Sequence, residues 1–350
     1  MKWKEILEGI QPVSNQWLER SRERLDNLTK PRGSLGVMET LAARFAAIRE
    51  EIPITLPKKE IFVFVGDHDV VEEGVSAYPQ EVTALMVKNF LIGGAAINVL
   101  ARCAGAGVSV IDIGMKAQLA DAENLVHKNV RQGASNIAAG PAMNPDEAAN
   151  AIEVGIEMAE KAHRSGVSMI ATGEMGIGNT TPSSALFSAL LPSDVADVTG
   201  RGTGLDDQGL QNKMDIIKKA LQENRNRMTD PLSTLAAVGG LEIAGICGLC
   251  LGGAANRIAV VVDGFISCAG ALVAMRMNPF VRDYLFFSHQ SVEKGHKTFF
   301  IKENIRPLLD LDLRLGEGTG AAIGMQIIEA AIRIFNEMAT FEDAGITPGA

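Results

Sequence analysis

One carboxylate, Glu317, lies between glycines in LRLGEGTGAA, residues 313–322. The glycines leave the backbone free of side chains, so a ligand can approach the main chain closely. A helical pattern follows over 321–338, and Thr319 is expected to cap its N-terminus. A glutamate in this setting suits a general base presented to a substrate. The alternative is a glycine-rich helix start whose glutamate only favours the positive end of the helix dipole.

Three glycine-rich loops indicate a phosphorylated ligand: GEMGIGNTT at 173–181, TGRGTG at 199–204 and GEGTG at 316–320. Such loops present backbone N–H groups, and a following helix adds a favourable dipole for phosphate. None has the Gly-Lys-Ser/Thr ending of a Walker motif, and none is a convincing dinucleotide fingerprint. Lys213, on a predicted helix after the second loop, is a candidate phosphate partner or an ordinary surface lysine.

A second carboxylate, Glu174, lies in the first of these loops. Two carboxylates in one crevice can have different roles, one as the general base and the other as an electrostatic or positioning group. Asp263 follows a predicted strand directly, where it is well placed to bind sugar hydroxyls. Each of these assignments competes with a role in loop capping.

Residues of the types that bind metals occur, but their spacing argues against a metal site. The DHD at 67–69 extends a strand, where side chains alternate sides and cannot all face one ion. His289 and His296 lack a glutamate at metalloprotease spacing, and the C-x-x-C at 247–250 lacks a second pair or a nearby histidine. We expect no metal and no cofactor.

The elements that must position these residues alternate between strands and helices. Short β-branched runs predict buried strands at 61–66, 108–113, 167–172, 258–262 and 284–288. Helical patterns fill the gaps, notably at 81–104, 146–165, 207–224 and 265–276. This alternation predicts an α/β fold with a parallel sheet and helices on both faces. Ligands of open parallel sheets bind beyond the carboxyl ends of the strands, where the polar and glycine-rich loops of this chain lie.

Both ends of the chain differ from this middle. Residues 1–50 are polar with a helical pattern, and the helical pattern at 321–338 has no strand after it. We therefore expect a large α/β catalytic domain over 60–300 and a small helical domain built from 1–59 with 301–350.

Composition restricts the partners and the compartment. The net charge of −9 argues against nonspecific binding of nucleic acid, which depends on clustered Lys and Arg. The four cysteines lie in apolar stretches, as expected for a reducing compartment. The N-terminus lacks the apolar run of a secretory signal, and Glu242 interrupts the most membrane-like segment, 232–255. We expect a soluble, cytoplasmic protein with no nucleic-acid or membrane partner.

Several segments together resemble the nicotinate-nucleotide–dimethylbenzimidazole phosphoribosyltransferase family, in order from about residue 30 to 325. They are KPRGSLG, GDHDVVEEGVSAYPQEVT, ATGEMGIGNTTPSSAL, VTGRGTG, VVDGFIS and LLDLDLRLGEGTGAA. The resemblance implies a Rossmann-like large domain, a small helical domain from both termini, and a homodimer. One departure is Asp69, where the family's GDHG pattern has glycine, and it affects the local turn.

The resemblance also implies a reaction and a set of site residues. Phosphoribose passes from nicotinate mononucleotide to 5,6-dimethylbenzimidazole with inversion at C1′, giving α-ribazole 5′-phosphate for cobalamin. Glu317 is the implied base, with Glu174 as the second catalytic carboxylate. The implied phosphate- and nucleotide-binding residues are Gly176, Gly178, Asn179, Thr180, Gly202, Lys213, Asp263, Gly264 and Ser291. The implied acceptor pocket consists of Ser76, Tyr78, Gln80, Met86 and Leu315.

Two other classes of protein are alternatives. One is a non-catalytic nucleotide-binding protein on the same fold, and the other is a phosphosugar isomerase or kinase on a similar scaffold. The absence of a Walker lysine argues against a kinase, and the LGEGTG block argues against an isomerase. The sequence alone does not fix the preferred acceptor base, the dimer interface or the division of roles between Glu174 and Glu317.

Overall fold

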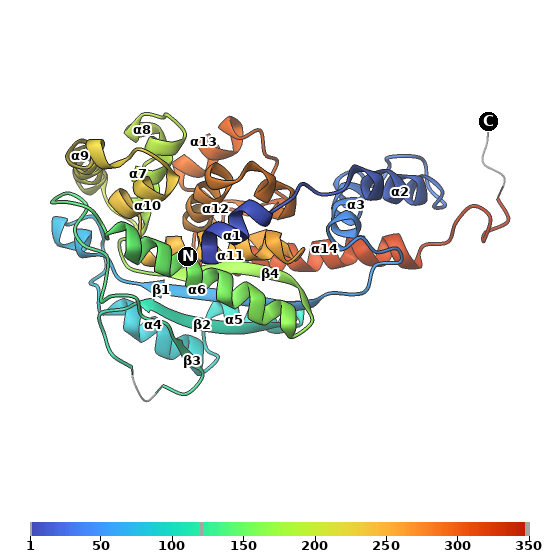
Figure 1. The fold of residues 1–350 in the computed structure, drawn as a ribbon, viewed down its shortest axis with the longest axis horizontal. Coiled ribbons are helices and arrows are strands. Elements are labelled where there is room, and N and C mark those ends of the chain that lie inside the picture. The colour runs from blue at the N-terminus through green and yellow to red at the C-terminus, as the bar shows by residue number, and fades with distance from the viewer. Residues whose placement is uncertain (1, 120–121, 347–350) are drawn as a thin grey trace.

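A parallel sheet forms the centre of the molecule in the computed structural model, which describes residues 2–119 and 122–346 (Figure 1). Within this part of the chain the sheet has six strands in the order β3-β2-β1-β4-β5-β6, and every neighbouring pair is parallel. The strands are β1 (Lys58–Gly66), β2 (Ala106–Gly114), β3 (Leu125–His127), β4 (Val167–Met175), β5 (Ala259–Val262) and β6 (Leu285–Phe287). This order is that of the doubly wound Rossmann fold, with its topological switch point between β1 and β4. The predicted α/β class and Rossmann-like sheet are therefore confirmed.

All five predicted strands are present, and the structure adds three short ones. β3 has only three residues, and β7 (His289–Gln290) and β8 (Leu309–Asp310) form a separate two-stranded parallel pair. Elements this short have too few residues to show an alternation of apolar and polar side chains. The last predicted strand is also shorter than expected, because Tyr284 ends the 3-10 helix η3 (Pro279–Tyr284).

Helices cover both faces of the sheet, as predicted (Figure 1). One face carries α6 (Pro145–Arg164) and α11 (Leu241–Ala255), and the other carries α4 (Val82–Leu91), α5 (Ala96–Ala104) and α14 (Thr319–Glu337). The pairing of α6 with α11 depends on glycine. A Cβ on Gly155 would lie 2.0 Å from the carbonyl oxygen of Gly245, and one on Gly248 would lie 1.9 Å from that of Ile152. The helix α11 of the Gly-rich segment 232–255 is thus packed closely in the core.

The helix predicted over 81–104 is wrong as a single element, because the chain breaks it into α4 and α5. Gly93, with a φ of +80°, lies in the break, and Ile92 beside it is 82% exposed. By length and composition the span Val82–Ala104 is apolar enough to cross a membrane, and 28% of its most apolar window is buried. The separate helices have 10 and 9 residues, however, and a spanning helix needs about 20.

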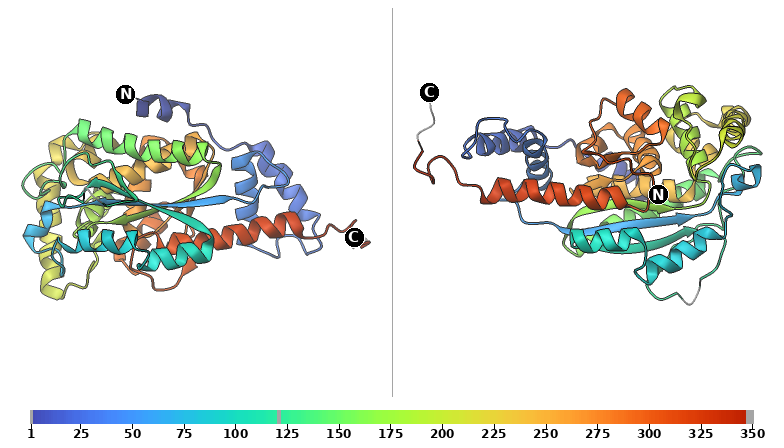
Figure 2. Two further views of the ribbon diagram at one scale, coloured as in Figure 1. Left: turned by 90° about the horizontal axis from the view of Figure 1, so that it is seen from below. Right: turned by 180° about the vertical axis from the view of Figure 1, so that it is seen from behind.

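The N-terminal helices divide between two places (Figure 2). α1 (Lys2–Gly9) packs against α6 and α11, and the Nδ2 of Asn278 donates to the carbonyl of Leu7 at 2.8 Å. α2 (Asn15–Asp26) and α3 (Val37–Arg49) pack together and α3 packs on α14, whose Phe335 carbonyl accepts from Nε of Arg24 at 2.9 Å. α2 and α3 therefore pack with the distal half of α14, whereas α1 packs on the helices that cover the sheet.

Candidate active site

A cavity of about 500 Å³ lies at the carboxyl ends of the strands, where the loops after β1, β4, β5 and β6 meet the start of α14. The predicted site residues that line it are Tyr78, Met86, Glu174, Gly176, Asn179, Thr180, Gly202, Gly264, Ser291, Leu315 and Glu317. Segments up to 239 positions apart in the chain thus share one surface, from Tyr78 to Glu317. This location is the one that open parallel sheets use for ligands.

Glu317 lies in a left-handed backbone turn at the cavity wall. Its φ is +63°, between Gly316 at +82° and Gly318 at +93°. A non-glycine residue in this region is strained, and such strain is concentrated at functional sites. The side chain is 4% exposed, and its Oε2 has no hydrogen-bond partner among the described residues. Burial raises the pKa of Glu317 to about 7, a backbone hydrogen bond at Ile97 opposes the rise, and the charge of Asp263 adds to it.

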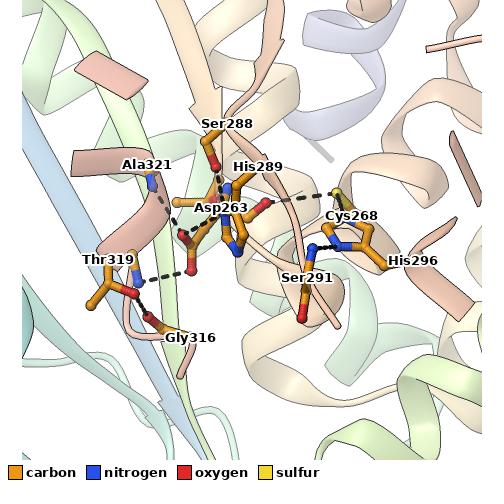
Figure 3. Close-up of polar contacts among 11 residues, drawn as sticks. Asp263, Cys268, Ser288, His289, Ser291, His296, Gly316, Thr319 and Ala321 are labelled. Carbon is orange, nitrogen blue, oxygen red and sulfur yellow. Dashed lines mark hydrogen bonds and ion pairs between the residues drawn. The ribbon is translucent and has the colours of Figure 1, made fainter. Parts of the chain in front are cut away.

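Asp263 holds the turn that carries Glu317 (Figure 3). Its Oδ2 accepts from the N–H of Gly318 at 3.0 Å, and its Oδ1 accepts from the N–H of Ala321 at 3.0 Å. The side chain is 1% exposed and does not line the cavity. The prediction that Thr319 caps α14 is wrong: Gly318 occupies the N-cap, and the hydroxyl of Thr319 donates to the Gly316 carbonyl at 2.8 Å. The carboxylate of Asp263, which follows β5, thus binds N–H groups at the start of α14 in place of a capping side chain from the helix itself.

Glu174, at the end of β4, faces the cavity from the opposite loop. It is 6% exposed, and Nδ2 of Asn179 donates to its Oε2. Burial is the main cause that raises the pKa of Glu174 to about 8, Asp263 adds to it, and the bond from Asn179 opposes it. Glu174 is therefore largely protonated at neutral pH, whereas Glu317 titrates close to 7. Two carboxyl groups whose pKa values differ are suited to different roles.

Lys213 is buried, so the alternative of a surface lysine is wrong. It lies on α9 (Asp207–Glu223) with an exposed fraction of 0%, and its Nζ donates to Oγ1 of Thr180 at 2.6 Å. A Cβ on Gly202 would lie 3.0 Å from this Nζ, so the second glycine loop packs directly on the ammonium group. Burial lowers the pKa of Lys213 to about 8, and Glu293 opposes this. Lys213 does not itself line the cavity but contacts Thr180 and Gly202, which do.

Three predicted residues other than Asp263 and Lys213 do not line the cavity. Gly178 packs behind it, since a Cβ there would lie 2.6 Å from Cγ2 of Val71. Ser76 supports the loop, with its Oγ 3.3 Å from Oγ1 of Thr203. Nε2 of Gln80 donates to the His68 carbonyl at 3.3 Å.

Ten lining residues were not among the predicted site residues. They are Val82, Met175, Ile177, Thr203, Phe265, Ile266, His289, Glu293, Arg314 and Gly316. Each lies within two positions of a residue that was predicted. The position of His289 just after the fifth predicted strand is the signal that identifies it.

Two buried histidines, His68 and His296, contact neighbouring protein groups. Among the described residues no group of three His, Cys, Asp or Glu is arranged to hold an ion. Nε2 of His68 lies 2.8 Å from Oε1 of Glu242. Nδ1 of His296 accepts from the N–H of Ser291 at 2.9 Å, and its Nε2 lies 3.2 Å from Sγ of Cys268 (Figure 3).

Two buried carboxyl groups and a buried ammonium group at the switch point of a doubly wound sheet suit the binding of a phosphorylated nucleotide. The family model described as Phosphoribosyltransferase matches residues 10–346. A Geobacter sp. (strain M21) protein called nicotinate-nucleotide–dimethylbenzimidazole phosphoribosyltransferase is 54% identical, over 98% of this chain and 99% of that protein. The chain belongs to that family, which confirms the resemblance seen in the sequence.

Further relatives agree. The protein of the same name from Geobacter sulfurreducens is 54% identical, over 99% of this chain and 98% of that protein. The crystal structure of CobT from Thermus thermophilus superposes with a TM-score of 0.91 at 46% identity, over 95% of this chain and 100% of that chain.

Proposed function

We propose that this chain transfers 5-phosphoribose from nicotinate mononucleotide to 5,6-dimethylbenzimidazole, giving nicotinate and α-ribazole 5′-phosphate. Family membership supports the reaction class. The observation that carries the chemistry is Glu317, whose Oε2 has no partner among the described residues and whose pKa of about 7 suits a general base near neutrality.

The reaction is a displacement at C1′ of the ribose. One imidazole nitrogen of the acceptor forms the new C–N bond while the bond to the nicotinate nitrogen breaks and its electron pair returns to the pyridine ring. The configuration inverts from β to α. The other acceptor nitrogen gives its proton to Glu317. The leaving ring is cationic before it departs, so the displacement involves no pyrophosphate charge that an ion would have to neutralise.

The two carboxyl groups take different parts in this scheme. Glu317 accepts the proton, and Glu174, protonated at neutral pH, adds no negative charge beside the base. Asp263 positions the base by holding the N–H groups of Gly318 and Ala321.

The nucleotide and the acceptor occupy different parts of the cavity. The phosphate binds at Thr180 and Gly202, where the ammonium group of Lys213 lies behind the wall. The other nucleotide-binding residues of this proposal that line the cavity are Gly176, Asn179, Gly264 and Ser291, and Gly178 and Asp263 support them from behind its wall. The flat acceptor packs against Tyr78, Met86 and Leu315, and Ser76 and Gln80 support that wall.

The proposal includes a cytoplasmic homodimer without a cofactor. Tyr78 and Leu315, at the cavity, are 55% and 57% exposed, and Leu85 on α4 is 60% exposed. The resemblance to the family is what implies the homodimer, and contiguous apolar surface is where a second subunit would pack. Light scattering of the purified protein tests the dimer, and a monomer at working concentrations contradicts it.

Purified protein incubated with both substrates and EDTA, followed by chromatography, tests the activity. We expect a new α-ribazole phosphate peak with one equivalent of nicotinate. Product that forms only after magnesium is added keeps the transferase and contradicts the metal-free mechanism. Bound nucleotide without product under either condition supports the non-catalytic alternative.

A further inference from the structure

His289 lies on the cavity wall with one ring nitrogen unoccupied, and neither the proposed mechanism nor the sequence analysis uses it. The side chain is 2% exposed and lines the cavity. Its Nδ1 lies 3.0 Å from Oγ of Ser288 and 3.9 Å from Oδ1 of Asp263 (Figure 3). Its Nε2 has no hydrogen bond to any residue that the structure describes. A polar ring atom without a protein partner is available to a ligand or to water.

Two glycines fix the orientation of this ring. A Cβ on Gly320 would lie 1.9 Å from Nδ1 of His289, and a Cβ on Gly264 would lie 3.4 Å from Cε1. The imidazole is therefore held between the first turn of α14 and the start of α12 (Phe265–Met277). Its Nδ1 edge faces Ser288 and Asp263, and its Cε1–Nε2 edge faces Gly264, another residue of the cavity lining.

His289 lines the same cavity as the residues at both ends of the proposed site. Ser291, two residues later, contacts Glu293, whose charge acts on Lys213 at the phosphate end. Asp263, on the other side of the ring, holds the amides that flank Glu317. A nucleotide whose phosphate is near Lys213 and whose C1′ faces the acceptor beside Glu317 has its ribose between these points.

We propose that Nε2 of His289 binds a ribose hydroxyl of the nucleotide. A hydroxyl both donates and accepts, so it pairs with Nε2 in either neutral tautomer of the ring. Ser288 and Asp263 position the imidazole, and Asp263 contributes to sugar binding through it. This inference rests on the proposed function.

The test compares His289→Phe, which keeps a flat ring and removes both nitrogens, with His289→Gln, which keeps a side-chain donor and acceptor. Calorimetry measures the Kd of nicotinate mononucleotide, its 2′-deoxy and 3′-deoxy analogues, and dimethylbenzimidazole. We expect His289→Phe to weaken nucleotide binding roughly 5- to 100-fold and to leave the acceptor unaffected, with partial recovery in His289→Gln. His163→Phe, at an exposed position on α6, is the matched control.

The deoxy analogues give the decisive result. For the wild type, the Kd of one deoxy analogue should equal the Kd of the parent nucleotide for His289→Phe. For the His289→Phe variant, that analogue and the parent nucleotide should have the same Kd. Equal losses on deoxygenation in wild type and variant overturn the inference, as does parallel weakening of nucleotide and acceptor. If the wild type itself neither binds the nucleotide nor forms product, the proposed function fails. Wild-type turnover with an unaffected His289→Phe variant rejects the role of His289 alone.

Discussion

Gly316 lies directly against Glu174: a Cβ on this glycine would be 2.2 Å from Oε1 of the carboxyl group. The loop that carries one buried acid is thus in contact with the other, although 142 positions separate Glu174 from Gly316 along the chain. A change in this loop therefore affects both acids together.

Gly316→Ala should greatly reduce turnover, because the new methyl group displaces Glu174 and the backbone φ of +82° strains any L-residue. The control is Gly166→Ala, whose φ of +74° imposes the same strain while no atom lies within 4 Å of the new Cβ. Product formation and melting temperature are measured for both. Equal losses of activity in the two variants contradict the importance of the contact with Glu174.

Glu317→Gln should lower kcat by about 10²- to 10⁴-fold, which is the usual contribution of a general base. That loss corresponds to roughly 3–5 kcal/mol of activation free energy. The wild-type rate should rise with pH through about 7, where Glu317 loses its proton, and the variant should lack this rise. Glu337→Gln, at the exposed end of the same helix, is the control. Wild-type turnover in a folded Glu317→Gln variant excludes Glu317 as the base, and a larger loss in Glu174→Gln moves the role there.

Glu174→Gln should stabilise the fold at alkaline pH. Because burial raises the pKa of Glu174 from 4.5 to about 8, the native state binds its proton more tightly than the unfolded state. Wild-type stability therefore falls as pH rises from about 4.5 to 8, and the variant lacks this part of the fall. We expect a gain of roughly 2–4 kcal/mol in the free energy of unfolding at pH 8 and almost none at pH 4. Denaturation at both pH values measures it, and a gain independent of pH contradicts the assignment.

Lys213→Met should weaken nucleotide binding by about 10- to 100-fold, since the phosphate at Thr180 and Gly202 loses the positive charge that lies behind them. The pKa of Lys213, lowered to about 8, adds a pH signature: wild-type affinity should decline as pH rises through about 8, and the variant should not show this decline. Lys219→Met, on the exposed side of the same helix, should leave affinity unchanged. The probes are nicotinate mononucleotide and its dephosphorylated nucleoside. A nucleoside weakened as much as the nucleotide shows that Lys213 does not act on the phosphate.

Asp69→Gly should change activity little, although the family pattern has glycine there. Asp69 has a negative φ, so the turn places no demand for glycine on this position. Its Oδ1 lies 2.5 Å from Nζ of Lys116, and both side chains are partly exposed. Loss of such an ion pair costs about 0–1 kcal/mol of stability. Steady-state kinetics and thermal melting test this, and a tenfold change in kcat contradicts it.

Much of the fold could be predicted because buried parallel strands are continuous β-branched runs, such as IFVFVG in β1. The division of 81–104 into α4 and α5 could not, because its apolar pattern continues through the break at Gly93. The N-cap of α14 was wrongly predicted to be the hydroxyl of Thr319 for a similar reason, because a sequence shows only the residues next to a helix end. The group that holds its amides is Asp263, 55 positions away from Gly318, and only the folded chain brings the two together.

The carboxylates and glycine loops were predictable from residue type and from their position after strands. The burial of Lys213 was not, because α9 carries it toward Thr180 by tertiary packing that has no local pattern. His289 illustrates the same limit. Its ring has a defined direction only because Gly264 and Gly320, at the starts of two different helices, leave room for it.

α14 is one continuous helix that connects the reaction site to the N-terminal helices α2 and α3. Its 19 residues span about 28 Å, at about 1.5 Å for each residue. Asp263 holds its first turn, while α3 and Arg24 hold its far end. A tilt of α2 and α3 therefore moves the C-terminal end of α14, while the N-terminal end stays held next to Glu317. The orientation of Glu317 and the packing of the N-terminal helices thus both depend on α14. Natural sequence variation at the two ends of this helix should therefore be correlated.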